Sequence, residues 1–179
     1  IETGDVKLNL DKMMKNKEKA VSILTKGVEF LFKKNKVTYL KGFGSFISDK
    51  KISVKGEDGK KKEIEAKNII IATGSEAMPM PNVEFDEKTI VSSTGALSLK
   101  EVPKSLVVVG GGYIGLEMGS VWSRLGAEVN VIEFLDHITP GMDREISEEF
   151  MKILKKQNIK FHLNRKVTSI KKTNNGVQI

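Results

Sequence analysis

The sequence predicts an α/β protein in which a long helix and a β-meander precede a second unit of alternating strands and helices. Three observations carry this prediction. Apolar residues recur at helical spacing over Asp11–Lys34, short alternating runs occupy residues 37–66, and a strand, a glycine turn, a helix and a second strand follow one another over residues 105–133. Periodicity and glycine punctuation are the main local signals for such elements.

The first half is expected to form one helix and a set of short strands. Lysines separate the apolar positions of the helix, and Asn35 and Lys36 end it. Three or four strands are expected to make a meander, with a turn at Gly56–Gly59 before the last of them. These strands are Val37–Leu40, Ser45–Ser48, Lys51–Val54 and Lys62–Ala66. A buried, fully apolar strand over Asn68–Ala72 is then expected to run into Thr73-Gly74-Ser75.

The second half follows a connector. Residues 76–92 contain two prolines and show no periodicity, so residues 1–92 and 93–179 are expected to be separate domains. The elements expected in the second domain are a short helix over Ser93–Leu99 capped by Ser92 or Ser93, a strand over Leu106–Val109, a helix over Tyr113–Leu125 with Gly126 behind it, a strand over Glu128–Glu133, a helix over Asp143–Gln157, and strands over Ile159–Leu163 and Lys166–Lys171.

Composition excludes several functional classes. The 179-residue chain is 39% apolar and 30% charged, as soluble globular proteins are. It has no apolar run long enough to cross a membrane and no secretory signal, so no membrane partner is expected. It has no cysteine, which excludes disulfides and thiol catalysis within the chain, and no metal site is expected.

The chain lacks an initiator methionine and stops within an expected strand, so we interpret it as part of a longer protein.

The net charge of +7 raises the alternative of nucleic-acid binding. Of the 30 basic residues only Arg124, Arg144 and Arg165 are arginines, and the rest are lysines interleaved with acidic residues. Aromatic residues that could stack on bases are sparse and lie apart from the basic runs. A solvated lysine-rich surface therefore explains the charge better than a nucleic-acid partner.

The glycine turn matches the dinucleotide-binding pattern G-x-G-x-x-G, with Gly110, Gly112 and Gly115 in the three glycine positions. The pattern alone is weak, but here it follows a strand, opens a helix and precedes a second strand that ends in Glu133. The first glycine permits the tight turn, the second lets the backbone approach a pyrophosphate, and the third lets the helix pack against the strand. An unrelated α/β fold with a glycine turn is the less favoured alternative.

Glu133 selects the nucleotide that the turn is expected to bind. A carboxylate at this position accepts hydrogen bonds from the adenosine ribose and repels a 2′-phosphate. A site for NADP(H) usually carries arginines at or just after this position, whereas the sequence continues Phe134-Leu135-Asp136. The sequence therefore predicts NAD(H) rather than NADP(H).

Thr73-Gly74-Ser75 is a second candidate nucleotide signal. Small residues at the carboxyl end of a buried strand permit close approach of a ligand. Taken by itself, an ordinary strand exit explains this segment equally well.

Four segments in this order resemble the flavin disulfide reductase family, and within it the dihydrolipoamide dehydrogenases. The segments are Thr73-Gly74-Ser75, Ser92–Leu97, Gly110–Glu117 and Gly119–Trp122. The likeness covers the whole chain, including the lysine-rich helix and Lys41–Gly44. An NAD domain interrupts an FAD domain in that family, so the resemblance implies a Rossmann-like NAD-binding domain preceded by part of an FAD-binding domain.

The resemblance also implies roles for individual residues. The positions that would contact FAD through their backbone are Gly44, Thr73, Gly74 and Ser75; those that would hold NAD are Gly110, Gly111, Gly112, Tyr113, Ile114, Gly115, Leu116, Glu117, Glu133 and Val167. Glu117 corresponds to a carboxylate near the nicotinamide and the flavin, which pairs in the family with a lysine that this chain lacks. Tyr113 stands where related reductases place a ring that covers the flavin, and a gate and a plain surface side chain are equally consistent with the sequence.

Other features of the family have no counterpart in this chain: the first FAD-binding glycine motif, the redox-active cysteine pair and the C-terminal His–Glu pair. The resemblance therefore implies a longer dihydrolipoyl dehydrogenase that reoxidises the dihydrolipoamide of 2-oxo acid dehydrogenase complexes and passes electrons through a disulfide and FAD to NAD⁺. The present chain alone is expected to be inactive. The implied partners are lipoyl domains and a second copy of the enzyme, in a bacterial cytoplasm or a mitochondrial matrix.

Two alternatives stay open. Another flavin disulfide reductase, such as glutathione or mercuric reductase, would share the motifs, although Glu133 argues against those that use NADP(H). A non-catalytic NAD-sensing module would explain the absence of cysteine, but it has no need of the Thr73-Gly74-Ser75 segment.

Overall fold

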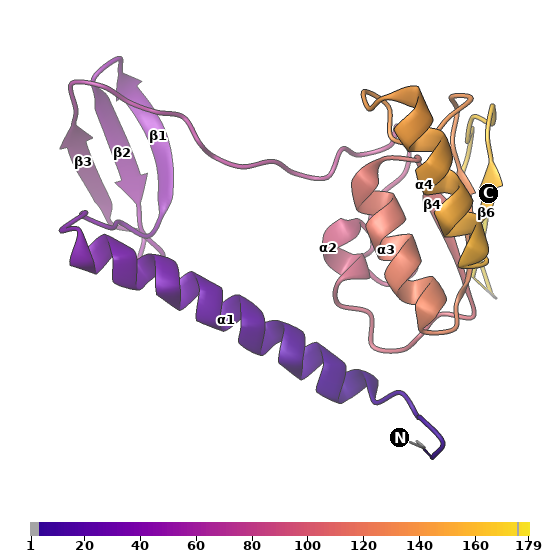
Figure 1. The fold of residues 1–179 in the computed structure, drawn as a ribbon. Coiled ribbons are helices and arrows are strands. Elements are labelled where there is room, and N and C mark those ends of the chain that lie inside the picture. Colours follow the sequence, from indigo (N-terminus) through magenta and orange to yellow (C-terminus); the bar gives the residue numbers. More distant parts are fainter. Residues whose placement is uncertain (1–3, 175) are drawn as a thin grey trace. The chain divides into compact units, whose positions relative to one another are not determined.

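The computed structural model describes residues 4–174 and 176–179, which form two compact units (Figure 1). One unit comprises Lys15–Glu76, and the other combines Ala77–Ile179 with the N-terminal chain up to Met14. The first contains most of a long helix and a three-stranded sheet, and the second contains the strands and helices around the glycine turn.

The long helix and the meander form largely as expected. The helix α1 spans Leu10–Lys34, and three antiparallel strands follow in the order β1-β2-β3. Their bounds are Phe43–Ser48 for β1, Lys51–Lys55 for β2 and Lys61–Glu65 for β3. The amide of Lys12 donates to Asn9 Oδ1 (2.9 Å) and so caps the start of α1, and Lys36 (φ 57°) turns the chain away at its end.

Two expected strands do not form. Val37–Leu40 is irregular, because the amide of Val37 donates to the carbonyl of Phe32 (2.9 Å) and thereby closes the end of α1. Asn68–Ala72 is neither a strand nor buried: Ile70 and Ile71 are 90% and 71% exposed. A strand exists only where a neighbour takes up its backbone hydrogen bonds, and no strand of the described residues pairs with this segment.

The second unit contains the predicted strand–helix alternation. Three parallel strands lie in the order β4-β5-β6, and α3 packs against the first two of them. The bounds are Ser93–Ala96 for α2, Ser105–Val109 for β4, Tyr113–Arg124 for α3, Glu128–Ile132 for β5, Arg144–Lys156 for α4, Lys160–His162 for β6, Lys171–Thr173 for β7 and Gly176–Gln178 for β8. This confirms the expected α/β class.

Local signals account for most of these boundaries. Ser92, rather than Ser93, caps α2 by accepting the amide of Thr94, and Gly126 (φ 111°) ends the turn after α3. The helix α2 is shorter than the expected Ser93–Leu99. The strand expected over Lys166–Lys171 is wrong for most of its length: β7 begins only at Lys171, where β8 provides its antiparallel partner.

The hydrophobic core of this unit ties α3, α4 and the sheet together. Its buried members are Leu116, Trp122, Ala127, Val129, Val131, Ile138, Leu154 and Ile159. The indole Nε1 of Trp122 donates to the carbonyl of Ala96 (3.1 Å), so this large side chain is buried without an unpaired polar atom. Gly119 brings α3 close to β5, since a Cβ there would lie 3.3 Å from Val129 Cγ1. The core therefore holds α3 rigidly against the strands that flank the glycine turn.

Candidate dinucleotide-binding site

The glycine turn joins β4 to α3 with the geometry expected of its three glycines. Gly110 has a φ of 99°, a conformation that residues with a side chain rarely adopt, and its amide donates to the carbonyl of Ile132 (2.8 Å). A Cβ at Gly115 would lie 2.7 Å from Val108 Cγ1, so only glycine lets the helix approach the strand this closely. A Cβ at Gly112 would meet nothing within 4 Å. The turn therefore leaves open space beside Gly112.

The N-terminus of α3 begins at this open space. The first intrahelical hydrogen bond runs from the amide of Leu116 to the carbonyl of Gly112 (3.1 Å), so the amides of the first turn, Tyr113 to Gly115, have no partner within the helix. Such amides and the helix dipole favour an anion at this end. The side chain of Tyr113 is 68% exposed, whereas that of Leu116 is fully buried in the core. Leu116 therefore serves the site by packing α3 into the core.

Glu133 places its carboxylate directly against the glycine turn. It follows β5 and is only 6% exposed. Its Oε2 accepts the amide of Gly111 at 2.6 Å, and its Oε1 accepts the amide of Leu135 at 2.7 Å. Charge-assisted hydrogen bonds of this kind hold a carboxylate firmly. The structure therefore fixes an acidic group beside the turn, in the place where the sequence predicts recognition of a ribose.

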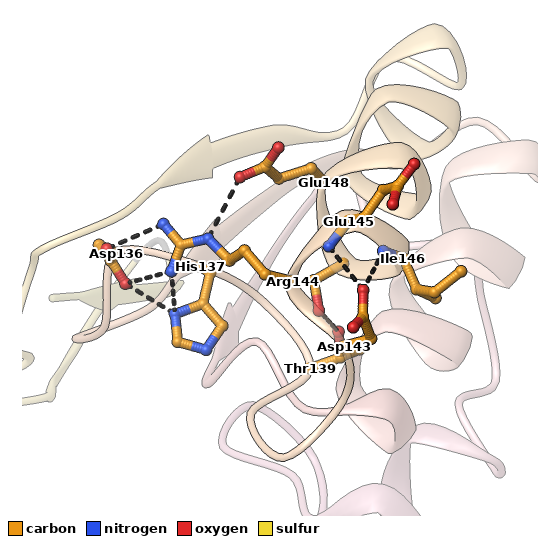
Figure 2. Close-up of polar contacts among 9 residues, drawn as sticks. Asp136, His137, Thr139, Asp143, Arg144, Glu145, Ile146 and Glu148 are labelled. Carbon is orange, nitrogen blue, oxygen red and sulfur yellow. Dashed lines mark hydrogen bonds and ion pairs between the residues drawn. The ribbon is translucent and has the colours of Figure 1, made fainter.

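A second acidic residue anchors the loop between Glu133 and α4, as Figure 2 shows. Asp136 accepts two hydrogen bonds from the Arg144 guanidinium, at 3.1 Å to Nη1 and 2.9 Å to Nη2, and Arg144 also contacts Glu148 (3.2 Å). Asp143 caps α4 by accepting the amide of Glu145 (2.9 Å). The Arg144 guanidinium, with a further hydrogen bond from His137, holds the pKa of the Asp136 carboxyl well below its usual range.

Replacing Asp136 by asparagine is expected to make stability less dependent on acid pH. Because the folded-state pKa is depressed, the ion pair stabilises the fold above the ordinary carboxyl pKa of about 3.9 and is lost progressively as the pH falls below that value. The difference in unfolding free energy between the natural chain and Asp136→Asn should therefore shrink on acidification. Urea unfolding of both chains at several pH values between neutral and acid measures this difference in unfolding free energy. Arg144→Gln removes the same pair from the other side and should behave alike; a constant difference at every pH would contradict this assignment.

The comparison with protein families decides the membership of the chain. The sequence model of the pyridine nucleotide-disulphide oxidoreductase family matches residues 3–179. The chain belongs to this family. The match spans both the meander and the glycine turn, so the two units are parts of one family sequence, and the resemblance to flavin disulfide reductases is confirmed.

Several curated relatives of the chain are dihydrolipoyl dehydrogenases. The chain is 61% identical over 180 residues to a dihydrolipoamide dehydrogenase of Chaetomium thermophilum. It is 55% and 53% identical to the mitochondrial dihydrolipoyl dehydrogenases of Dictyostelium discoideum and Pisum sativum. These alignments cover 100%, 98% and 100% of the chain but 36% of each relative. The chain therefore spans about a third of the length of these relatives.

Two solved structures share the fold of this chain. LpdA of Mycobacterium tuberculosis matches with a TM-score of 0.87 at 23% identity, over 97% of this chain and 39% of that one. The HOCl-induced flavoprotein disulfide reductase RclA of Escherichia coli matches with a TM-score of 0.76 at 30% identity, over 93% of this chain and 38% of that one. The α/β architecture is thus the one seen in this oxidoreductase family.

The structure places the other predicted site residues either away from the glycine turn or at its edge. Glu117 is exposed on α3, one turn beyond Tyr113. Val167 lines a hollow over the sheet together with Asn130 and His162. Gly44 lies in β1, while Thr73-Gly74-Ser75 is exposed and outside any strand or helix, with Gly74 at a φ of 81° and open space at its Cβ. All four predicted FAD positions are exposed.

One group of site residues was not predicted from the sequence. Thr139 and Ser147 join the loop after Glu133 to α4, and Thr139 reaches the glycine turn. Nothing in the residue types signals this, because a threonine with a positive φ has no sequence signature. The serine lies on the buried side of α4, at a position that binary patterning assigns to an apolar residue.

Within residues 4–174 and 176–179, no three His, Asp or Glu side chains lie close enough together to hold a metal ion. Across the same described part of the chain, no helix combines the length and apolar character that a membrane span requires.

Proposed function

We propose that this chain forms the NAD(H)-binding site of a dihydrolipoyl dehydrogenase. One observation carries the proposal: the Glu133 carboxylate is buried against the Gly110–Gly115 turn, with a hydrogen bond from the amide of Gly111. An acidic group in this place is what recognition of an unphosphorylated adenosine ribose requires. The high identity to dihydrolipoyl dehydrogenases supports the choice of enzyme.

The residues of the turn fit a dinucleotide. The open space beside Gly112 admits a pyrophosphate, whose charge the first-turn amides of α3 attract. Each oxygen of Glu133 accepts one backbone amide and retains a further lone pair for a ribose hydroxyl. When bound, the dinucleotide would supply a nicotinamide for hydride transfer. The protein's part is to bind the adenosine and pyrophosphate and to exclude a 2′-phosphate.

We assign the remaining predicted residues within this proposal. Tyr113 and Glu117 stand on the exposed side of α3, where they would face the nicotinamide, and Val167 would lie near the adenine. Gly44 and Thr73-Gly74-Ser75 would contact FAD, and residues 1–92 and 93–179 would belong to the FAD and NAD domains. The exposed, unpaired segment that carries Ile70 and Ile71 supports this, since a buried site in the longer enzyme would cover those side chains.

The activity of the whole enzyme would be the reoxidation of dihydrolipoamide, with a disulfide and FAD carrying electrons to NAD⁺. Its partners would be the lipoyl domains of 2-oxo acid dehydrogenase complexes and a second copy of the enzyme. The relatives from Dictyostelium discoideum and Pisum sativum are mitochondrial proteins, which supports a mitochondrial location.

Titration of the 179-residue chain with NADH tests the binding proposal. We expect saturable binding of NADH, followed by the fluorescence of the nicotinamide, and much weaker binding of NADPH, because Glu133 repels its 2′-phosphate. ADP-ribose, which lacks the nicotinamide, should compete with NADH. Failure of NADH to bind would contradict the proposal, and tighter binding of NADPH would contradict the role of Glu133.

A further inference from the structure

Thr139 has an unusual backbone conformation in the loop between β5 and α4. Its φ is 50°, in the left-handed region that β-branched residues avoid, and the residue is only 8% exposed. Such a conformation is strained for a β-branched residue and persists only where the surroundings impose it. The contacts of Thr139 show what imposes it.

Both the backbone and the side chain of Thr139 are engaged. Its amide donates to the carbonyl of Gly111 (2.8 Å), the middle residue of the glycine turn. Its hydroxyl shares a buried hydrogen bond of 2.8 Å with the hydroxyl of Ser147 on α4, which is 1% exposed. Its carbonyl accepts the amide of Met142 (3.1 Å). Thr139 is therefore a link between α4 and the turn.

Gly111 is consequently held on both sides of its α-carbon. Glu133 accepts its amide at 2.6 Å, and Thr139 donates to its carbonyl at 2.8 Å. Ile138 packs against the same residue, since a Cβ on Gly111 would lie 3.2 Å from Ile138 Cγ2. The peptide that leads from Gly111 to Gly112 thus has a fixed orientation, and with it the amides that begin α3.

We propose that Thr139 and Ser147 are positioning residues for the dinucleotide. The hydroxyl pair holds the left-handed turn at Thr139, which holds the Gly111 carbonyl and so aims the neighbouring amides at the pyrophosphate. This inference rests on the proposed NAD(H) binding. It explains why strain and a buried polar pair occur together here, where an apolar pair and a glycine would fold at lower cost.

The test compares Ser147→Ala with Ser120→Ala in the 179-residue chain, by NADH titration and thermal unfolding. Ser120 is a matched control: it is 8% exposed, and its hydroxyl bonds to Gln157 (2.8 Å) and Arg124 (3.2 Å), which lie outside the loop that carries Thr139. Both variants lose one buried hydroxyl and should lose similar stability. Only Ser147→Ala should weaken NADH binding, about threefold to tenfold, as the loss of one positioning hydrogen bond permits.

A second pair of variants separates the hydroxyl from the shape of the side chain. Thr139→Ser keeps the hydroxyl and should bind NADH like the natural chain, whereas Thr139→Val keeps the shape and should weaken binding as Ser147→Ala does. Because the two residues share one hydrogen bond, the double variant Thr139→Val/Ser147→Ala should bind little worse than either single variant.

The outcomes distinguish this inference from the proposed function. If the natural chain does not bind NADH, the proposed function fails. If the natural chain binds NADH but Ser147→Ala and Thr139→Val bind it equally well, the positioning role is overturned while NAD(H) binding stands.

Discussion

Replacing Glu133 by alanine is expected to weaken NADH binding by about a hundredfold, because the two charge-assisted hydrogen bonds that we propose to the ribose would be lost. The same change leaves the amides of Gly111 and Leu135 without their acceptor. Burial of unpaired amides costs about 1–3 kcal/mol each, so the chain should also be less stable. NADH titration and urea unfolding measure the two effects separately.

Glu133→Gln is the control for the loss of stability. Glutamine has the same shape and keeps one acceptor oxygen, but it turns an NH₂ group toward one of the two backbone amides. Its stability should lie between those of the natural chain and Glu133→Ala, and its discrimination against NADPH should fall because the negative charge is gone. Unchanged preference for NADH in both variants would remove Glu133 from the specificity site.

Gly115→Ala is expected to disturb the fold of the turn itself. The added Cβ would lie 2.7 Å from Val108 Cγ1 and 3.2 Å from the carbonyl oxygen of Gly110, so α3 must move away from β4. Overpacking of this kind costs about 1–3 kcal/mol, of which the better helix propensity of alanine returns at most about 1 kcal/mol. The displaced amides should bind NADH about tenfold more weakly or worse.

Gly112→Ala provides the contrasting variant at the same turn. Gly112 has a φ of −73°, and a Cβ there meets no other atom within 4 Å, so the substitution meets no steric clash and should cost only the N-cap preference for glycine over alanine. The methyl group projects into the space assigned to the pyrophosphate and should weaken NADH binding strongly. Thermal unfolding separates the two cases, because the clash at Gly115 should lower the melting temperature more than the loss of the N-cap glycine does. Equal NADH affinity of Gly112→Ala and the natural chain would place the pyrophosphate elsewhere.

Elements with local signals were predictable from the sequence, and elements that need distant partners were not. The apolar spacing of α1 and of α4 depends on residues within a few positions, and both helices form within one residue of their expected bounds. The apolar run around Ile70 has the composition of a buried strand, but a strand also needs a neighbour, and none of the described residues supplies one. For the same reason β7 begins only at Lys171, where β8 pairs with it.

The sequence by itself determined the glycine turn, its place between a strand and a helix, and the acidic residue that follows the next strand. These features depend on backbone freedom at Gly110 and on the order of elements, and residue types and their spacing determine both. Only the tertiary structure decided that Glu133 bonds to Gly111, and that Thr139 holds the same residue from the other side. Those contacts join residues more than twenty positions apart, and a hydrogen bond at that separation exists only after the core has packed α3, α4 and the sheet together.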